Sequence, residues 1–165
     1  MVDMFEIQAA YYMVAATGVL VAAFYYIISV RNNNKARQAQ LYYGIWQKMN
    51  TPEAWKAMHY WDDVAIESYD EWENLRKDPE MRDSWSVNLS TFEGISIFAR
   101  EGLIDMRLLA RDMGGQYVYW WRRWGPFIKE YRVRNSWQRY GIEAEWLYER
   151  MVEFGRRNPD FQIPQ

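Results

Sequence analysis

The chain has 165 residues and a formal net charge of −2, which suits one domain with an appended segment. So small a net charge excludes a global electrostatic footprint for nucleic acid, and we expect no nucleic-acid partner. The absence of cysteine excludes disulfides, thiolate metal sites and cysteine nucleophiles, and a single histidine excludes multi-histidine metal centres. Aromatic residues make up 18% of the chain, which suits a helical core of large side chains or a chain beside a bilayer.

The N-terminal segment 7–30 contains no charged residue. As a helix it would cover about 36 Å, enough to cross a hydrocarbon core of about 30 Å. A secretory signal peptide fits poorly, because acidic residues precede the segment and its apolar region is too long. Arg31, Lys35 and Arg37 follow it. By the positive-inside bias we therefore predict a single-pass protein of the cell (plasma) membrane, with residues 1–6 outside and the C-terminal domain cytoplasmic.

Small side chains lie near one face of this predicted transmembrane helix. They are Ala15, Gly18, Ala22 and Ser29. Such a face lets helix backbones approach closely in lipid, so it favours self-association or docking to another span. The alternative is that glycine and alanine are simply common in spans.

Helical spacing continues beyond the span, so residues 31–50 are predicted to form a stalk helix that continues the transmembrane helix. Two helix start signals follow, each a capping residue before a proline: Thr51 with Pro52, and Asp78 with Pro79.

Three further helices are predicted, and the sequence has no alternating strand pattern. They cover 103–113, where Gly114 and Gly115 would end the helix, then 116–134 and 137–154. Residues 156–165 are expected to form a loose tail. The predicted fold class is therefore all-α: a transmembrane helix, a stalk, and one compact cytoplasmic helical domain over residues 51–155, a bundle of about five helices.

The stretch 116–134 is rich in both rings and cations. On a helix one set of large side chains falls within an arc of about 120°, while Arg122, Arg123 and Lys129 lie on the other side. The set is Tyr117, Trp120, Trp121, Trp124, Phe127, Ile128 and Tyr131. This separation favours a core helix, with a membrane-surface helix as the alternative. A nucleic-acid platform would need rings and cations on one surface. Arg122 and Arg123 would then be free to recognise a phospholipid, the chain's own acidic segment or another protein.

The acidic counterpart is the run "WDDVAIESYDEWE". Carboxylates at i, i+4 could share a helix face as metal ligands, but the motifs of di-iron bundles and calcium loops are missing. We therefore expect no metal site and no cofactor. The favoured interpretation is a solvated face that complements a basic face of this chain or of a neighbouring subunit. Its candidate interaction residues are Asp62, Asp63, Glu67, Asp70 and Glu71.

Two single residues suggest chemistry. His59 stands alone among large apolar side chains, where a satisfied boundary histidine is the simpler interpretation than a haem ligand or catalytic base. Glu93 flanks the apolar stripe of its predicted helix, and a partly buried carboxylate there would need a cationic partner. We therefore expect a buried ion pair between Glu93 and an arginine of a later helix, and no catalytic residue.

Four stretches in this order resemble a known family: "RNNNKARQAQLYYGIWQKMNTPEAWKAMHYW", "STFEGISIFAREGLIDMRLLARDMGG", "YWWRRWGPFIKEYRVR" and "IEAEWLYERM". The family is an uncharacterised prokaryotic one of small membrane-anchored helical proteins, known only as a domain of unknown function. The resemblance covers roughly residues 31–154 and implies one N-terminal span and a helical domain. It implies no activity, cofactor or catalytic residue.

The expected function is that of a non-enzymatic single-pass membrane protein whose cytoplasmic helical domain mediates protein–protein contacts. It would act as an accessory subunit of a larger membrane complex, a scaffold or a homo-oligomer, in contact with the lipid bilayer. The alternative is a membrane-tethered binding module for lipid headgroups or a hydrophobic small molecule, using the Trp/Arg-rich helix 116–134.

Overall fold

The computed structural model describes residues 3–164, and these are all-α, with six α-helices and one short 3-10 helix. The predicted fold class is thereby confirmed. The chain divides into two compact units, one ending at Gln40 and the other beginning at Leu41. The second unit starts before the predicted boundary at residue 51, because Tyr42, Ile45 and Met49 already pack against its core.

Helix α1 (Met4–Met49) is a single helix that includes both the predicted span and the predicted stalk. Its most apolar 18-residue window has a mean hydropathy of 2.1. Within the described residues, it is the one helix long and apolar enough to cross a membrane.

Both proline start signals begin helices where the sequence predicts them. Thr51 caps α2 (Pro52–His59), and its hydroxyl accepts a hydrogen bond from the Ala54 amide at 3.2 Å. Asp78 caps α4 (Pro79–Arg100), and its carboxylate accepts from two backbone amides at 2.8 and 3.1 Å. These side chains satisfy backbone donors that a helix leaves unpaired in its first turn.

A short helix that the sequence analysis missed, α3 (Tyr69–Leu75), lies within the acidic run. Ser68 caps it, accepting from the Glu71 amide at 3.3 Å. Seven residues make only two turns, too few to show a helical period. Tyr69 and Trp72 are nevertheless buried, so tertiary packing selects the helix.

The predicted break at Gly114 and Gly115 is wrong, because α5 (Met106–Arg134) runs through both glycines as one helix. A methyl group on Gly114 would lie 3.2 Å from Ile163 and 3.3 Å from Met151. The glycine therefore permits close approach of later segments to the helix. Packing on this face outweighs a helix-propensity cost of about 1 kcal/mol per glycine.

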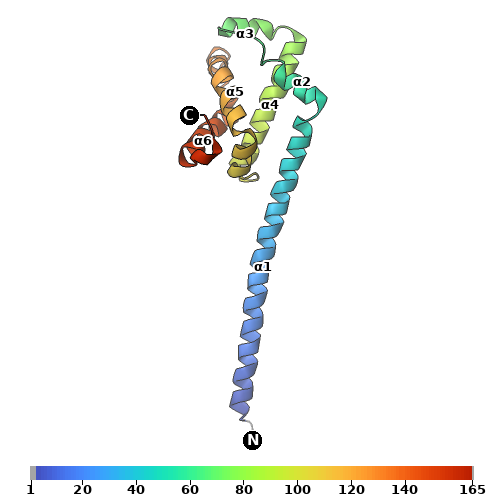
Figure 1. Cartoon of the computed structure of the whole chain (residues 1–165), viewed down its shortest axis with the longest axis vertical. Helices are drawn as coiled ribbons and strands as arrows, with labels where there is room; N and C mark the ends of the chain where they lie inside the picture. Colours follow the sequence, from blue (N-terminus) through green and yellow to red (C-terminus); the bar gives the residue numbers. More distant parts are fainter. Residues whose placement is uncertain (1–2, 165) are drawn as a thin grey trace. The chain divides into compact units, whose positions relative to one another are not determined.

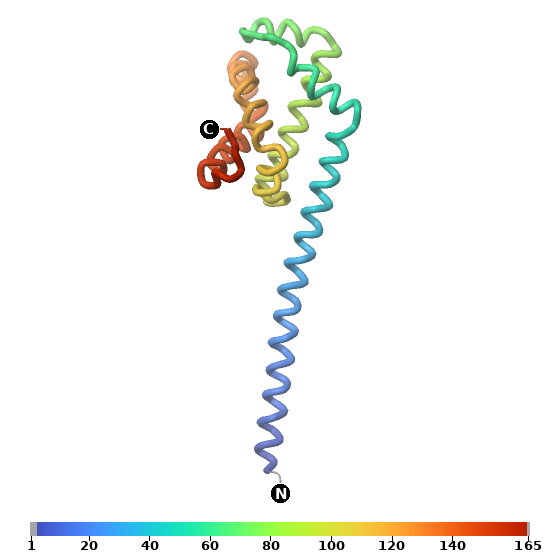
Figure 2. The backbone as a smooth tube through the Cα atoms, in the orientation of Figure 1, coloured from blue at the N-terminus to red at the C-terminus, as the bar shows by residue number. Residues whose placement is uncertain are grey.

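The C-terminal segment is also more ordered than expected. Helix α6 (Ile142–Arg157) begins after the predicted residue 137, and a 3-10 helix, η1 (Pro159–Phe161), follows it. Ile163 is buried against Gly114, so the tail is not loose. The backbone after α6 turns back beside α5 (Figure 2).

In the second unit, α6 packs against both α4 and α5, and α2 packs against α4. Helix α3 lies at the end of this bundle where α4 begins (Figure 1). One buried hydroxyl joins α4, α5 and α6. Tyr117 of α5 donates to the Ala144 carbonyl of α6 at 3.0 Å. The same hydroxyl lies 2.8 Å from Oγ of Ser96 on α4. Burial raises the pKa of Tyr117, which keeps this hydroxyl protonated and able to donate.

The core is dominated by indole rings that meet around Trp85 of α4. Its ring lies 5.0 Å from that of Trp72, 5.3 Å from Trp61 and 5.6 Å from Trp124. All four side chains are at most 1% exposed. The rings meet mostly edge to face, the arrangement that the aromatic quadrupole favours. The ring-lined face of the Trp-rich stretch is thus core.

Two glycines of α5 should respond oppositely to alanine. At Gly115 the nearest atom to an added methyl group is 3.8 Å away, so Gly115→Ala should raise the free energy of unfolding by about 0.5–1 kcal/mol. At Gly125 the methyl group would lie 2.8 Å from the buried Trp121 ring, so Gly125→Ala should lower the free energy of unfolding by about 1–3 kcal/mol. Denaturation of the detergent-solubilised chain, followed by tryptophan fluorescence, measures both. Equal shifts in the two variants would contradict the packing argument.

Candidate functional site

A cavity of about 270 Å³ lies among α2, α4 and α5. Its wall includes apolar surface from Met58, Phe92 and Trp124. Polar atoms reach it from His59 of α2 and Asn88 of α4. Mainly apolar walls with a few polar groups are typical of small-molecule sites.

The orientation of the Asn88 amide is set by one hydrogen bond. Its Nδ2 donates to the Met58 carbonyl at 3.3 Å, so the oxygen, Oδ1, is the atom left over. Asn88 is 1% exposed, and Oδ1 has no hydrogen-bond partner in the described chain. A residue that lines the cavity therefore carries a buried, unpaired acceptor.

The His59 ring is held from two directions. Its Nδ1 lies 2.6 Å from a carboxylate oxygen of Asp62, and its face stacks on Trp55 with ring centroids 4.4 Å apart. A carboxylate is an acceptor, so Nδ1 carries the hydrogen and Nε2 of the neutral ring is an acceptor. Nε2 is buried without a partner in the described residues.

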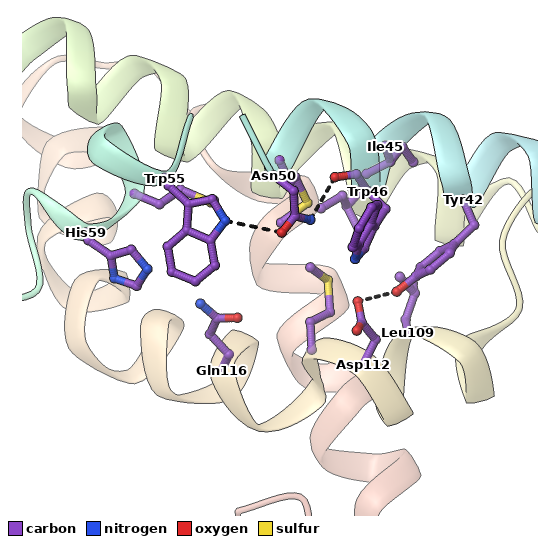
Figure 3. A pocket seen from close by; sticks show the side chains of 13 residues that line it. Tyr42, Ile45, Trp46, Asn50, Trp55, His59, Leu109, Asp112 and Gln116 are labelled. Carbon is purple, nitrogen blue, oxygen red and sulfur yellow. Dashed lines mark hydrogen bonds between the residues drawn. The ribbon is translucent and has the colours of Figure 1, made fainter. Parts of the chain in front are cut away.

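A second cavity, of about 160 Å³, shares Met58, His59 and Gln116 with the first. Figure 3 shows His59, Trp55 and Gln116 converging on one space, with Tyr42 further along the wall. The Tyr42 hydroxyl donates to the Asp112 carboxylate, and burial together with this bond raises the pKa of Tyr42. Most other wall residues of this cavity are methionine, isoleucine, leucine or tryptophan.

Sequence reasoning missed most of this site. It named His59 but placed no partner beside it, and it assigned no binding role to Asn88, Gln116 or Trp120. One signal was present, because Asn88 is a polar residue on the same helix face as Trp85 and Phe92. A polar residue within an apolar stripe marks a buried polar group that needs a partner.

The predicted acidic surface is only partly free. Its five members are all exposed: Asp62, Asp63, Glu67, Asp70 and Glu71. Asp70 pairs with Arg134 at 2.6 Å, and Glu71 accepts from the Glu67 amide at 3.0 Å. The carboxylates of Asp63 and Glu67 make no ion pair within the described chain, so these two are available to a partner.

The predicted basic surface is used largely inside the fold. Arg123 donates to the backbone carbonyls of Asp62 and Val64 at 2.7 and 2.6 Å, which ties α5 to the segment after α2. Lys129 pairs with Glu145 at 2.7 Å. Arg122 is exposed and reaches the Pro164 carbonyl at 3.5 Å. Of the alternatives named for Arg123, the structure shows a contact with the chain's own acidic segment, made through backbone carbonyls.

Glu93 does not form the expected ion pair. Its carboxylate accepts a hydrogen bond from the Glu143 amide at 3.1 Å, at the start of α6. Burial raises its pKa, and the backbone amides of α6 partly offset that effect. In the described residues the buried arginine of this region, Arg132, pairs instead with Glu145. The carboxylate therefore acts as a cap for α6, where unpaired amides attract negative charge.

The small residues of the predicted span show no contact that would test their role. Ala15, Gly18 and Ala22 are exposed and Ser29 is partly exposed in the first unit. A methyl group placed on Gly18 would have no described atom within 4 Å apart from its chain neighbours and the nearby backbone of its own helix. No group of three or more metal-ligating side chains occurs among residues 3–164.

These features define a class: an all-helical protein with one long apolar N-terminal helix and an indole-rich helical unit. The chain belongs to the family described as a domain of unknown function, DUF4760, whose model matches residues 12–151. This confirms the resemblance to a family known only as a domain of unknown function. No curated protein and no solved structure matches the chain.

The carboxyl groups of Glu93 and Glu145 should contribute to stability with opposite dependences on pH. The pKa of Glu93 is raised, so its favourable contribution is present below the ordinary value near 4.5 and is lost as pH rises through the folded value. Burial also acts to raise the pKa of Glu145, but hydrogen bonds from Lys129 and Arg132 outweigh it and the net pKa is lowered. Its contribution is therefore present above the ordinary value and is lost as pH falls.

We expect Glu93→Gln to gain stability relative to wild type as pH rises from about 4 to 6. Glu145→Gln should lower the free energy of unfolding most near neutral pH, and this loss of stability should shrink as pH falls below about 4. Denaturation curves of the solubilised chain at several pH values measure both. Parallel pH profiles for the two variants would contradict these assignments.

Proposed function

We propose that this chain is a non-enzymatic, single-pass protein of the cell membrane whose helical domain makes protein–protein contacts. The N-terminus would lie outside and the domain in the cytoplasm. The apolar helix α1 and the basic residues Arg31, Lys35 and Arg37 after its uncharged segment support the membrane placement.

The observation that carries the contact function is a groove of about 610 Å³ along α4, the end of α5 and the start of α6. Large apolar side chains stand exposed beside it: Trp137 is 53%, Ile97 46% and Ile142 40% exposed. Arg76, Arg82 and Arg139 also line it. Tryptophan, tyrosine and arginine are the residue types enriched in protein interfaces.

The partner that fits this groove best is a second copy of the chain. The groove carries three arginines against Glu93 and Glu143, while Asp63 and Glu67 are exposed carboxylates without ion pairs in the described residues. The acidic segment of one copy would thus complement the arginine-lined groove of another. The small-residue face of α1, with Gly18 and Ala22, would support the same association in the bilayer.

Charge exchange tests this contact on the full chain in lipid nanodiscs or detergent, with mass measured by light scattering. We expect a homo-oligomer whose dissociation constant rises at least tenfold in Arg139→Glu or Glu67→Arg. The double variant should regain most of the affinity, because the charges are exchanged. Arg107→Glu, an exposed arginine on α5 outside the groove lining, is the matched control. A monomeric wild type, or equal effects of Arg107→Glu and Arg139→Glu, would contradict the proposal.

Membrane topology is tested with single cysteines, since the chain has none. A membrane-impermeant maleimide should label Asp3→Cys on intact cells. Arg107→Cys should be labelled only after the cells are permeabilised. The reverse pattern would place the domain outside, and labelling of neither variant in intact cells would remove the proposed orientation.

A second candidate function is small-molecule binding by the domain. The cavity lined by Gln116, Trp120 and Trp124 of the Trp-rich helix supports it. The variant of this function in which the arginines bind lipid headgroups has less support, because Arg123 is engaged by backbone carbonyls.

A further inference from the structure

Three polar atoms are unpaired on residues that line the cavity of about 270 Å³. They are Nε2 of His59, Oδ1 of Asn88 and Nε1 of Trp120, each buried without a partner in the described chain. Leaving one such atom unpaired costs about 1–3 kcal/mol, so buried polar groups are normally matched by protein, water or ligand. The other unpaired buried atoms of the described residues do not line this cavity. That three such residues line one cavity indicates that a molecule occupies it.

The hydrogen-bonding roles of the three atoms are defined. Asn88 offers an acceptor, because its Nδ2 already donates to Met58. In its neutral form His59 offers an acceptor at Nε2, because the Asp62 carboxylate accepts from Nδ1. The indole N–H of Trp120 is a donor only. The matching molecule must therefore supply at least one donor and one acceptor.

The charge around the two cavities disfavours anions. No lysine or arginine lines either cavity, while the carboxylates of Asp62 and Asp112 do. The walls are otherwise apolar, with Phe92, Trp124 and Met58 around the larger space. A space of about 270 Å³ suits a molecule of one or two rings, since benzene binds a cavity of about 150 Å³.

We propose that this cavity binds an uncharged aromatic compound that carries a hydroxyl or N–H group. Such a group donates to His59 or Asn88, and a hydroxyl or carbonyl oxygen accepts from Trp120. The aromatic ring packs on Phe92, Trp124 and Met58, and the adjoining cavity takes an apolar substituent. The inference rests on the second candidate function and is independent of the contact groove.

Isothermal titration calorimetry on the full chain in lipid nanodiscs tests the site, with empty nanodiscs as the blank. The probes are 4-hydroxyphenylacetamide and 4-hydroxyphenylacetate, which match in shape and differ in charge. We expect saturable binding of one amide per chain, and at least tenfold weaker binding of the carboxylate. Phenylacetamide, which lacks the phenol hydroxyl, should bind at least fivefold more weakly than 4-hydroxyphenylacetamide.

Two adjacent tryptophans provide the matched variants. Trp120→Phe removes the indole N–H from the cavity wall and should weaken binding of 4-hydroxyphenylacetamide at least fivefold. Trp121→Phe changes a ring that is as well buried, 4% exposed against 5%, but that lines neither cavity. It should leave the affinity within twofold. His59→Phe keeps a ring beside Trp55 and removes the acceptor, so it should also weaken binding at least fivefold.

Three outcomes would overturn the assignment. Absence of saturable binding by 4-hydroxyphenylacetamide to folded protein would mean that ordered water alone fills the cavity. Equal binding of the carboxylate would contradict the charge argument. Equal losses of affinity in Trp120→Phe and Trp121→Phe would mean that the substitutions act through core packing and not through the indole N–H of Trp120. Light scattering on the same samples should show an unchanged oligomer mass in Trp120→Phe, so failure here is distinguishable from failure of the protein contact.

Discussion

The packing of the second unit depends on the Trp85 indole. Its rings meet those of Trp61, Trp72 and Trp124, which brings α4 together with α5 and with both ends of the acidic run. Its Nε1–H donates to the Tyr140 hydroxyl at 2.6 Å, in the turn before α6. Each aromatic pair adds about 0.5–1.5 kcal/mol beyond the area it buries. The Trp85 side chain thus contacts four parts of the chain. Its ring packs on three tryptophans, and its only hydrogen-bond donor reaches Tyr140.

A core made from rings also explains why polar atoms remain unpaired beside it. Indoles are large and rigid, so they meet at fixed angles and leave spaces that smaller side chains would fill. Asn88 and Trp120 lie next to such a space, and His59 closes it from α2. The same packing that stabilises the unit is accompanied by a cavity lined by residues with donors and acceptors, an arrangement that would reduce the cost of binding a ligand.

Charged side chains divide into two groups with different roles. Arg123 and Arg132 are turned inward, where they satisfy backbone carbonyls and the Glu145 carboxylate. Arg139, Asp63 and Glu67 stay exposed. Such arginines hold segments in place because their planar fork can bind two acceptors at once. Exposed charges contribute little to stability and are suited to orienting a partner.

Local sequence alone determined the all-helical class, the long apolar helix, the starts of α2 and α4, and the inward face of the Trp-rich stretch. These depend on periodicity and capping, which act within a few residues. Tertiary structure decided that α5 continues through Gly114, because Ile163 and Met151 fill the space above that glycine. It also decided that Arg123 is engaged, that Glu93 caps α6, and that His59, Asn88 and Trp120 share a cavity. These outcomes depend on contacts between residues up to 61 positions apart, and no local pattern specifies which distant atom will satisfy a buried polar group.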